Sequence, residues 1–225
     1  MKPEKWLGQN ESELVSLDDK HKLHPSVLEA FGLMQHAAFR DGIDLQLVSS
    51  YRSFERQCAI WNNKWLGNTE LRDANSSVID TSKISDTDKL HAILTWSALP
   101  GGSRHHWGTD IDVYDRGAVM RWDGTFSLIE EEYESQGPCH ALALWLQHHM
   151  HEFGFFRPFE INKGGVACEP WHLSHRNTAQ AFEVSRDISL LTNAINAANI
   201  EGKAVIIDNI EAIYHRYVLN EGVTQ

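Results

Sequence analysis

The stretch that decides the fold runs from Ser103 to Asp112 and has the sequence SRHHWGTDID. Gly108 permits a tight turn after the histidines, because glycine adopts backbone angles that other residues avoid. Beyond this turn, polar and apolar residues alternate with the period of a strand, so we expect a strand over 109–115. The apolar residues of that strand would face the core, and Asp110 and Asp112 would therefore face a cleft.

A second informative segment runs from Glu169 to His172 and has the sequence EPWH. A catalytic zinc ion takes three protein ligands from histidine and carboxylate side chains and leaves one position for water. His105, Asp112 and His172 would supply that set, and Glu169 would remain free as a general base. Simple alternation would point residues 169 and 172 to opposite faces, so we expect the strand to bulge or end at Pro170.

Several nearby residues have simpler interpretations. Asp110 is an alternative to Asp112 as the metal ligand. Cys168 would point away from Glu169, and we interpret it as a buried thiol. The chain has 13 histidines, and a single surface histidine is usually an ordinary residue. His148, His149 and His151 cluster, but consecutive positions on a helix do not share a face, so we expect no metal role for them. We interpret the following in the same way, as ordinary residues: His21, His36, His91, His106, His148, His149, His151 and His215.

The spacing of apolar residues predicts helices around a small sheet. The expected helices cover 24–40, a segment from about 53, a segment capped by Asp86 or Thr87, 138–153, 179–198 and 205–219. Besides the strand over 109–115, the expected strands cover 43–48, 155–161 and 166–171, with a hairpin arm over 119–126 and a surface insertion over 67–85. The fold class is therefore α+β, with helices packed against a small, mostly antiparallel sheet.

The composition is that of one globular domain. A chain of 225 residues with 42% hydrophobic residues can bury a core of its own. We expect a single domain over 1–225, with a core over about 24–176 and a helical extension over 177–225. A net charge of −11 argues against a nucleic-acid binder, and no apolar run approaches the roughly 18 residues of a membrane span.

Together, the two segments resemble the LAS family of zinc D,D-peptidases, which includes VanY-type D-alanyl-D-alanine carboxypeptidases, VanX dipeptidases and related endolysins. The family pattern is S-x-H-x-x-G-x-A-x-D followed by E-x-W-H, and the chain departs from it where Asp110 replaces alanine. Upstream, the stretch from Tyr51 to Gln57, YRSFERQ, is similar to the family's Y-R-S-x-x-x-Q. The resemblance covers about 24–175 and implies a hedgehog/D,D-peptidase-like fold.

The resemblance implies a role for each matching residue. His105, Asp112 and His172 would bind one Zn²⁺ ion, and Glu169 would act as catalytic base and acid. Arg52 would stabilise the oxyanion, the alternative being a structural salt bridge. The residues implied to contact or brace the substrate are Tyr51, Ser53, Gln57, Ser103 and Trp171.

The resulting hypothesis is a zinc carboxypeptidase that acts on peptidoglycan-derived peptides ending in D-amino acids. A D-Ala-D-Ala dipeptidase, an L,D-carboxypeptidase and an endolysin-type endopeptidase are alternatives within the same chemistry. A catalytically silent metal-binding module is a further alternative, against which the unligated Glu169 argues. The N-terminus shows no signal peptide and the three cysteines are interpreted as reduced thiols. We therefore expect a cytoplasmic protein, or one that reaches the cell envelope by another route or with a leader outside the given sequence.

Overall fold

The computed structural model describes residues 2–74 and 76–223, so residues 1, 75, 224 and 225 of the expected domain lie outside the described part. Its α-helices are α1 (Pro3–Trp6), α2 (Pro25–Arg40), α3 (Phe54–Trp65), α4 (Asp86–Trp96), α5 (Arg116–Met120), α6 (His140–His149), α7 (Arg176–Glu183), α8 (Ile188–Ala197), α9 (Lys203–Asp208) and α10 (Ile210–Ile213). Short 3-10 helices are η1 (Thr81–Lys83), η2 (Arg104–Trp107), η3 (Glu130–Tyr133) and η4 (Met150–Phe153), and η5 (Tyr214–Val218) is a π-helix. The strands are β1 (Val15–Ser16), β2 (Lys22–Leu23), β3 (Leu45–Ser49), β4 (Asp110–Asp115), β5 (Phe155–Phe156) and β6 (His172–His175).

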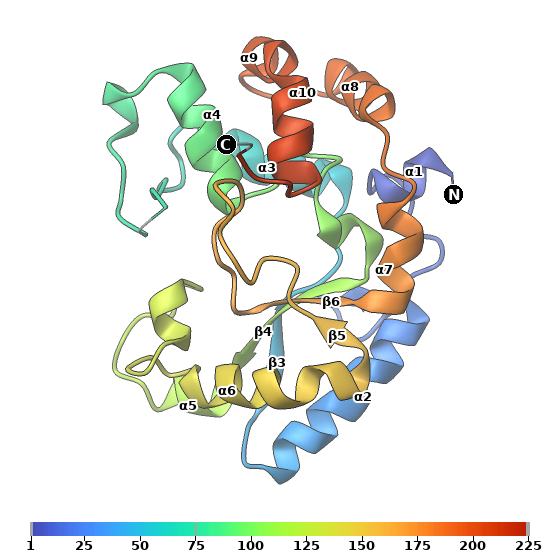
Figure 1. Ribbon diagram of the computed structural model, residues 1–225, viewed down its shortest axis with the longest axis vertical. Coiled ribbons are helices and arrows are strands. Elements are labelled where there is room, and N and C mark those ends of the chain that lie inside the picture. Colours follow the sequence, from blue (N-terminus) through green and yellow to red (C-terminus); the bar gives the residue numbers. More distant parts are fainter. Residues whose placement is uncertain (1, 75, 224–225) are drawn as a thin grey trace.

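An antiparallel sheet with the strand order β3-β4-β6-β5 lies at the centre of the molecule (Figure 1). The register pairs Asp110 with Ser174 and Asp112 with His172. These four polar side chains therefore sit on neighbouring strands at adjacent levels of one sheet. The small, antiparallel sheet that the sequence predicts is confirmed.

One hydrophobic core lies between this sheet and helices α2 and α6 (Figure 1). Ile111 and Val113 of β4 and Leu173 of β6 are fully buried in it. Because side chains alternate across a strand, Asp110 and Asp112 point to the opposite face, as expected. We call α2, α5, α6 and β3–β6, together with η2 and the loop 169–171 that leads into β6, the sheet half of the molecule.

A second core lies on the other side of the sheet and is built by helices (Figure 1). It joins Trp61 of α3 and Leu90 of α4 to Leu191 of α8 and Ile206 of α9, each of which is fully buried. We call α1, α3, α4, α7–α10 and η5 the helical half. The C-terminal helices thus share one core with helices from the middle of the chain.

Of two strand predictions near the C-terminal motif, one is wrong and the other is too long. Residues 166–171 form no strand, and β6 instead begins at His172. Pro170 lacks the N–H that a strand ladder needs, and the chain turns there with His172 N donating to Glu169 O at 3.2 Å. The strand expected over 155–161 is limited to β5, Phe155–Phe156.

Two further boundaries differ from the sequence prediction. No hairpin arm forms over 119–126: α5 ends at Met120 and residues 121–126 are irregular. Asp115 caps α5 by accepting from Ala118 N at 3.0 Å. The helix expected over 179–198 is divided into α7 and α8, because Asp187 starts a new helix by accepting from Leu190 N at 3.0 Å. Asp and Asn side chains favour such helix starts.

The three cysteines are all free. Cys168 is half-buried rather than buried, since it lies in an irregular segment and not in the expected strand; its Sγ donates to Glu160 O at 3.4 Å. Within the described residues, no helix is both long enough and apolar enough to cross a bilayer.

Candidate metal centre and substrate cleft

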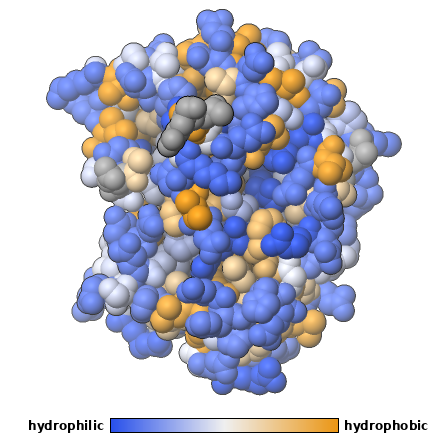
Figure 2. Space-filling model, in the orientation of Figure 1, coloured by the Kyte–Doolittle hydropathy of each residue, from blue (hydrophilic) through white to orange (hydrophobic). Residues whose placement is uncertain are grey.

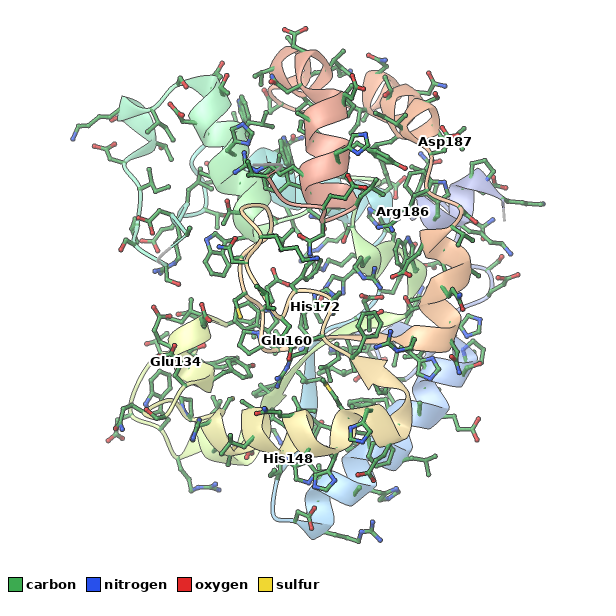
Figure 3. The ribbon with its side chains drawn as sticks, viewed as in Figure 1. Glu134, His148, Glu160, His172, Arg186 and Asp187 are labelled. Carbon is green, nitrogen blue, oxygen red and sulfur yellow. The ribbon has the colours of Figure 1, made fainter. Side chains whose placement is uncertain are left out.

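Three side chains from separate segments converge on the polar face of the sheet. His105 comes from η2, Asp112 from β4 and His172 from the start of β6, and all three are buried. Their potential ligand atoms lie within 4.8 Å of one another. His105 Nε2 is 3.2 Å from Asp112 Oδ2, and His172 Nδ1 is 3.3 Å from Asp112 Oδ1. In Figure 3, His172 lies near the middle of the molecule, whereas His148 lies on the outer helix α6.

These three residues, which we call the metal group, have the donor atoms and surroundings that a metal ion needs. Asp112 Oδ1 is buried and accepts no hydrogen bond from the residues that the structure describes, which is costly for a carboxylate unless a cation compensates it. The outer nitrogen of His105, Nδ1, is 2.8 Å from Ser50 O, a contact typical of metal-binding histidines. Although burial raises the pKa of Asp112, the two imidazoles hold that pKa well below its ordinary value.

Gly108 ends η2 and directs the chain into β4, as expected. Its φ is 67°, in the left-handed region, and a Cβ there would meet Leu14 Cδ2 at 2.6 Å. The neighbouring His106 faces the other way, with Nδ1 2.6 Å from Arg52 O and Nε2 accepting from Gly101 N at 2.9 Å. Burial lowers the pKa of His106 to about 3. His106 therefore lies outside the group of potential ligands, as the sequence predicts, but it is a buried, hydrogen-bonded histidine rather than a surface one.

Glu169 stands beside the three clustered residues. Its Oε2 lies 3.2 Å from His172 Nδ1, and its side chain is 11% exposed. Burial raises the pKa of Glu169, and this effect outweighs the opposing one of His172. The break expected at Pro170 is present, and the turn is what brings residues 169 and 172 to the same side.

Arg52 reaches the same place from the loop after β3. Its Nη2 is 3.2 Å from Asp112 Oδ2, its Nη1 donates to Gln57 Oε1 at 3.2 Å, and its Nε donates to Ser49 Oγ at 3.0 Å. Gln57 is itself fixed, because its Nε2 donates to Ala98 O at 2.8 Å. The guanidinium is therefore held in one orientation at the edge of the metal group.

A cavity of about 460 Å³ opens in front of these residues, between the two halves. The sheet half contributes the metal group and Trp171, and Glu169 lies beside them. The helical half contributes Lys64, Tyr217 and Val218. Figure 2 shows that this face of the molecule is largely hydrophilic and is hollowed near its middle.

Of the four remaining residues predicted to contact the substrate, two line the cavity and two make structural contacts. Ser103 and Trp171 line the cavity, and Trp171 also stacks on Trp96 with ring centroids 6.4 Å apart. Tyr51 and Ser53 make structural contacts instead: Tyr51 Oη donates to Gly8 O at 3.2 Å, and Ser53 caps α3 by accepting from Arg56 N at 3.2 Å. Contact of Tyr51 and Ser53 with a substrate stays a prediction.

Sequence reasoning missed Lys64 in α3. Its side chain lines the cavity and makes no hydrogen bond or ion pair with any residue that the structure describes. Burial lowers the pKa of Lys64, nearby Arg52 lowers it further, and Glu169 opposes them. A signal was present, since Lys64 follows Gln57 by seven residues and so lies on the same face of the helix.

Asp110 is placed behind His172 rather than among the ligand atoms. Its Oδ1 is 3.0 Å from His172 Nε2, the ring nitrogen that faces away from Asp112. The structure thus groups Asp112, and not Asp110, with the two histidines.

Known proteins are similar to this chain in both sequence and fold. The family model for VanY, D-alanyl-D-alanine carboxypeptidase, matches residues 20–178. An uncharacterized protein of Haemophilus influenzae is 38% identical over 101 residues, which are 43% of this chain and 69% of that protein. A D-alanyl-D-alanine carboxypeptidase of Enterococcus faecalis is 25% identical over 180 residues, which are 79% of this chain and 57% of that protein.

Two solved structures show the same fold. VanYB in complex with D-alanine-D-alanine has a TM-score of 0.55 and 20% identity, covering 85% of this chain and 92% of that chain. A vancomycin-resistance D,D-pentapeptidase VanY mutant in complex with Zn(II) has a TM-score of 0.54 and 23% identity, covering 77% of this chain and 85% of that chain. Given the match of the family model over 20–178, the chain belongs to the VanY family of D-alanyl-D-alanine carboxypeptidases.

Proposed function

We propose that this protein is a zinc-dependent carboxypeptidase that removes the terminal D-amino acid from peptidoglycan-derived peptides. The observation that carries the proposal is the convergence of His105, Asp112 and His172, with Glu169 beside them, in one cavity. Membership of the VanY family supports the substrate class. Relatives of the same fold bind Zn(II) and D-alanine-D-alanine, which supports both the metal and the ligand.

His105, Asp112 and His172 would hold the ion. Two imidazoles and one carboxylate are a ligand set of catalytic zinc, which leaves a position open for water or substrate. A zinc ion held there would supply Lewis-acid chemistry and would lower the pKa of bound water toward ~7. Ser50 O and Asp110 occupy the outer ring nitrogens, so both rings present the remaining nitrogen to Asp112.

Glu169 is the proposed general base and acid. It would take a proton from the attacking water and deliver it to the leaving amine of the scissile bond. A carboxylate whose pKa is raised by burial suits this exchange, because it can hold the proton between the two steps. Its position 3.2 Å from His172 Nδ1 puts it on the side of the ring where the ligand atoms meet.

Arg52 is the proposed donor to the carbonyl oxygen of the scissile bond as negative charge develops there. Its contacts with Gln57 and Ser49 fix the planar fork of donors before a substrate arrives. The same guanidinium pairs with Asp112, so it lies next to the ligand group.

Lys64 favours a carboxypeptidase over an endopeptidase. A peptide cut near its end carries a terminal carboxylate close to the scissile bond, and an unpaired ammonium in the cavity would attract it. Lys64 supplies such a cation near both Arg52 and Glu169. An endopeptidase substrate has no charge at that place to balance it.

The test uses synthetic peptides ending in D-Ala-D-Ala, as the free acid and as the terminal amide, and one ending in L-Lys-D-Ala. Mass spectrometry of the products, with zinc and with a chelator, identifies the bond that is cut. We expect loss of a single D-Ala from the free acid, abolished by the chelator and restored by zinc. Internal cleavage of longer peptides would point to an endopeptidase, and no cleavage of any peptide by the zinc-loaded protein would contradict the proposal.

A further inference from the structure

We propose that Asp110 is a positioning residue of the metal centre, which orients the ring of His172 through a carboxylate–imidazole hydrogen bond and takes no place on the metal itself. The inference rests on the proposed function in one respect, since it assumes a metal held by His172. It assigns a role to the one residue at which the chain departs from the motif pattern it resembles, where alanine would offer no acceptor.

The two carboxylate oxygens of Asp110 are occupied by protein donors. Oδ1 accepts from Arg104 Nε at 2.7 Å and lies 3.0 Å from His172 Nε2. Oδ2 accepts from Thr109 Oγ1 at 2.6 Å and from Ser174 Oγ at 3.0 Å. With four partners and no solvent exposure, the carboxylate is engaged entirely on the side of His172 that faces away from Asp112.

The guanidinium of Arg104 compensates the buried negative charge of Asp110. An uncompensated buried carboxylate is strongly unfavourable, and Arg104, 9% exposed, lies against it. The guanidinium also donates to Ser174 Oγ at 2.7 Å and to Glu183 Oε1 of α7 at 2.7 Å. It lies over the ring of Trp107, 4.7 Å from the centroid. Arg104 and Asp110 therefore form a fixed pair that ties the sheet to α7.

The consequence for His172 follows from the two nitrogens of one ring. A neutral imidazole carries its proton on one nitrogen and a lone pair on the other. A carboxylate at Nε2 keeps the proton there, so the lone pair of Nδ1 is directed toward Asp112 Oδ1 and Glu169 Oε2, 3.3 and 3.2 Å away. A carboxylate partner also makes a ligating imidazole a stronger donor to the metal.

His105 is held by a weaker hydrogen-bond acceptor than His172. Its outer nitrogen, Nδ1, faces the neutral backbone carbonyl of Ser50 at 2.8 Å. Both rings are therefore held by one acceptor each, but only His172 has a charged one. The strand register produces this difference, because Asp112 is opposite His172 and Asp110 is the next residue on the same face of β4.

The test compares wild-type protein with Asp110→Asn, Asp110→Ala and the matched control Asp115→Asn. Asp115 is also buried and on β4, but it caps α5 and does not contact His172. Zinc alone is the probe, and its affinity for the metal-free proteins is measured by competition with a chromogenic chelator. We expect affinity to fall 10–100-fold in the Asp110 variants and to stay within about twofold in the control. Affinities within about twofold of wild type in folded Asp110 variants would overturn the proposal.

A second measurement needs no variant and therefore also applies if the Asp110 variants fail to fold. Proton NMR of the zinc-loaded wild-type protein, with nitrogen-labelled histidine, reports the hydrogen bond that each outer ring N–H makes. We expect the Nε2 proton of His172, which faces a carboxylate, to resonate further downfield than the Nδ1 proton of His105, which faces a neutral carbonyl, and a His172 proton that exchanges rapidly with solvent or resonates upfield of the His105 proton would overturn the proposal. A wild-type protein that binds no zinc would refute the proposed function and this inference together, whereas normal zinc binding with unaltered Asp110 variants would refute this inference alone.

Discussion

The sheet half and the helical half line one cavity with different kinds of side chain. The sheet half holds His105, Asp112 and His172 in one buried cluster, in which strand register places Asp112 opposite His172. The helical half faces them with Lys64, an ammonium without a protein partner among the described residues, and with the side chains of Tyr217 and Val218. The sheet half thus brings a fixed set of potential metal ligands, and the helical half brings a cation that no described side chain pairs. Under the proposed function, bond cleavage belongs to the sheet side of the cavity and substrate selection to the helical side.

The largest effect should come from Glu169→Gln, which keeps the shape of the side chain but removes the proton acceptor. We expect kcat to fall by about 10²–10⁴-fold, with zinc content unchanged because Glu169 is outside the ligand group. Steady-state rates and zinc content of the same samples check this. The exposed neighbour Glu160 gives the control, Glu160→Gln, which should keep its rate. Near-normal turnover in zinc-loaded Glu169→Gln would remove Glu169 from the chemistry.

A smaller loss is expected from Arg52→Lys and Arg52→Ala. Losing one donor to the developing charge should lower kcat/KM by about 10²–10³-fold, and lysine cannot replace the fixed fork that contacts Asp112 and Gln57. The control is Arg116→Lys, which disturbs an exposed ion pair with Asp44. If Arg52 is only a structural partner of Asp112, the variants will lose melting temperature while each folded, zinc-loaded molecule keeps its rate.

The helical side is tested by Lys64→Met. We expect KM for a peptide with a free terminal carboxylate to rise about tenfold, the loss of one charged hydrogen bond, with kcat little changed. The terminal amide of the same peptide should show no difference between wild type and variant. Lys89→Met is the matched control, since Lys89 pairs with Asp86 on α4. A fall in kcat with unchanged KM would break the division between the two halves.

The smallest effect concerns the pH dependence of stability in the helical half. His91 Nδ1 is 2.9 Å from Tyr217 Oη; burial lowers the pKa of His91, Arg216 lowers it further, and Asp88 opposes them. The folded state therefore binds this proton less readily than the unfolded state, whose pKa is about 6.5. The stabilisation is complete above that value and is lost as pH falls below it.

His91→Gln removes this titration and can keep a hydrogen bond to Tyr217. Melting temperatures measured between pH 7 and pH 5 should therefore decline less steeply in the variant than in the wild type. Identical slopes would show that His91 carries no such linkage, and a changed kcat/KM at pH 7 would show that the helical half is coupled to the chemistry.

The clustering of His105, Asp112 and His172 could be predicted because each of its two segments is organised by local information. Gly108 and the alternation of β4 place Asp112 relative to His105, and Pro170 forces the turn that places Glu169 relative to His172. Each step spans a few residues and follows from backbone chemistry. The helices with clear apolar spacing, such as α2 and α6, were predictable for the same reason.

The lining of the cavity and the role of Asp110 could not be predicted, because both depend on contacts between residues distant in the chain. Lys64 and Tyr217 meet at one cavity only because the C-terminal helices pack on α3 and α4. The role of Asp110 depends on Arg104, Ser174 and Glu183, which no single spacing connects. The strand expected over 166–171 was wrong because apolar residues there pack as an irregular segment rather than as a ladder.

The central claim is that His105, Asp112 and His172 hold one zinc ion that Glu169 does not ligate. Anomalous X-ray diffraction at the zinc edge, on crystals of the zinc-loaded protein, tests it most directly. The account predicts a single peak at this site, about 2.0–2.2 Å from His105 Nε2, His172 Nδ1 and a carboxylate oxygen of Asp112, with Asp110 still bonded to His172 Nε2. A peak ligated by Asp110 in place of Asp112, or a zinc ion bound elsewhere with this site free of metal, would contradict it.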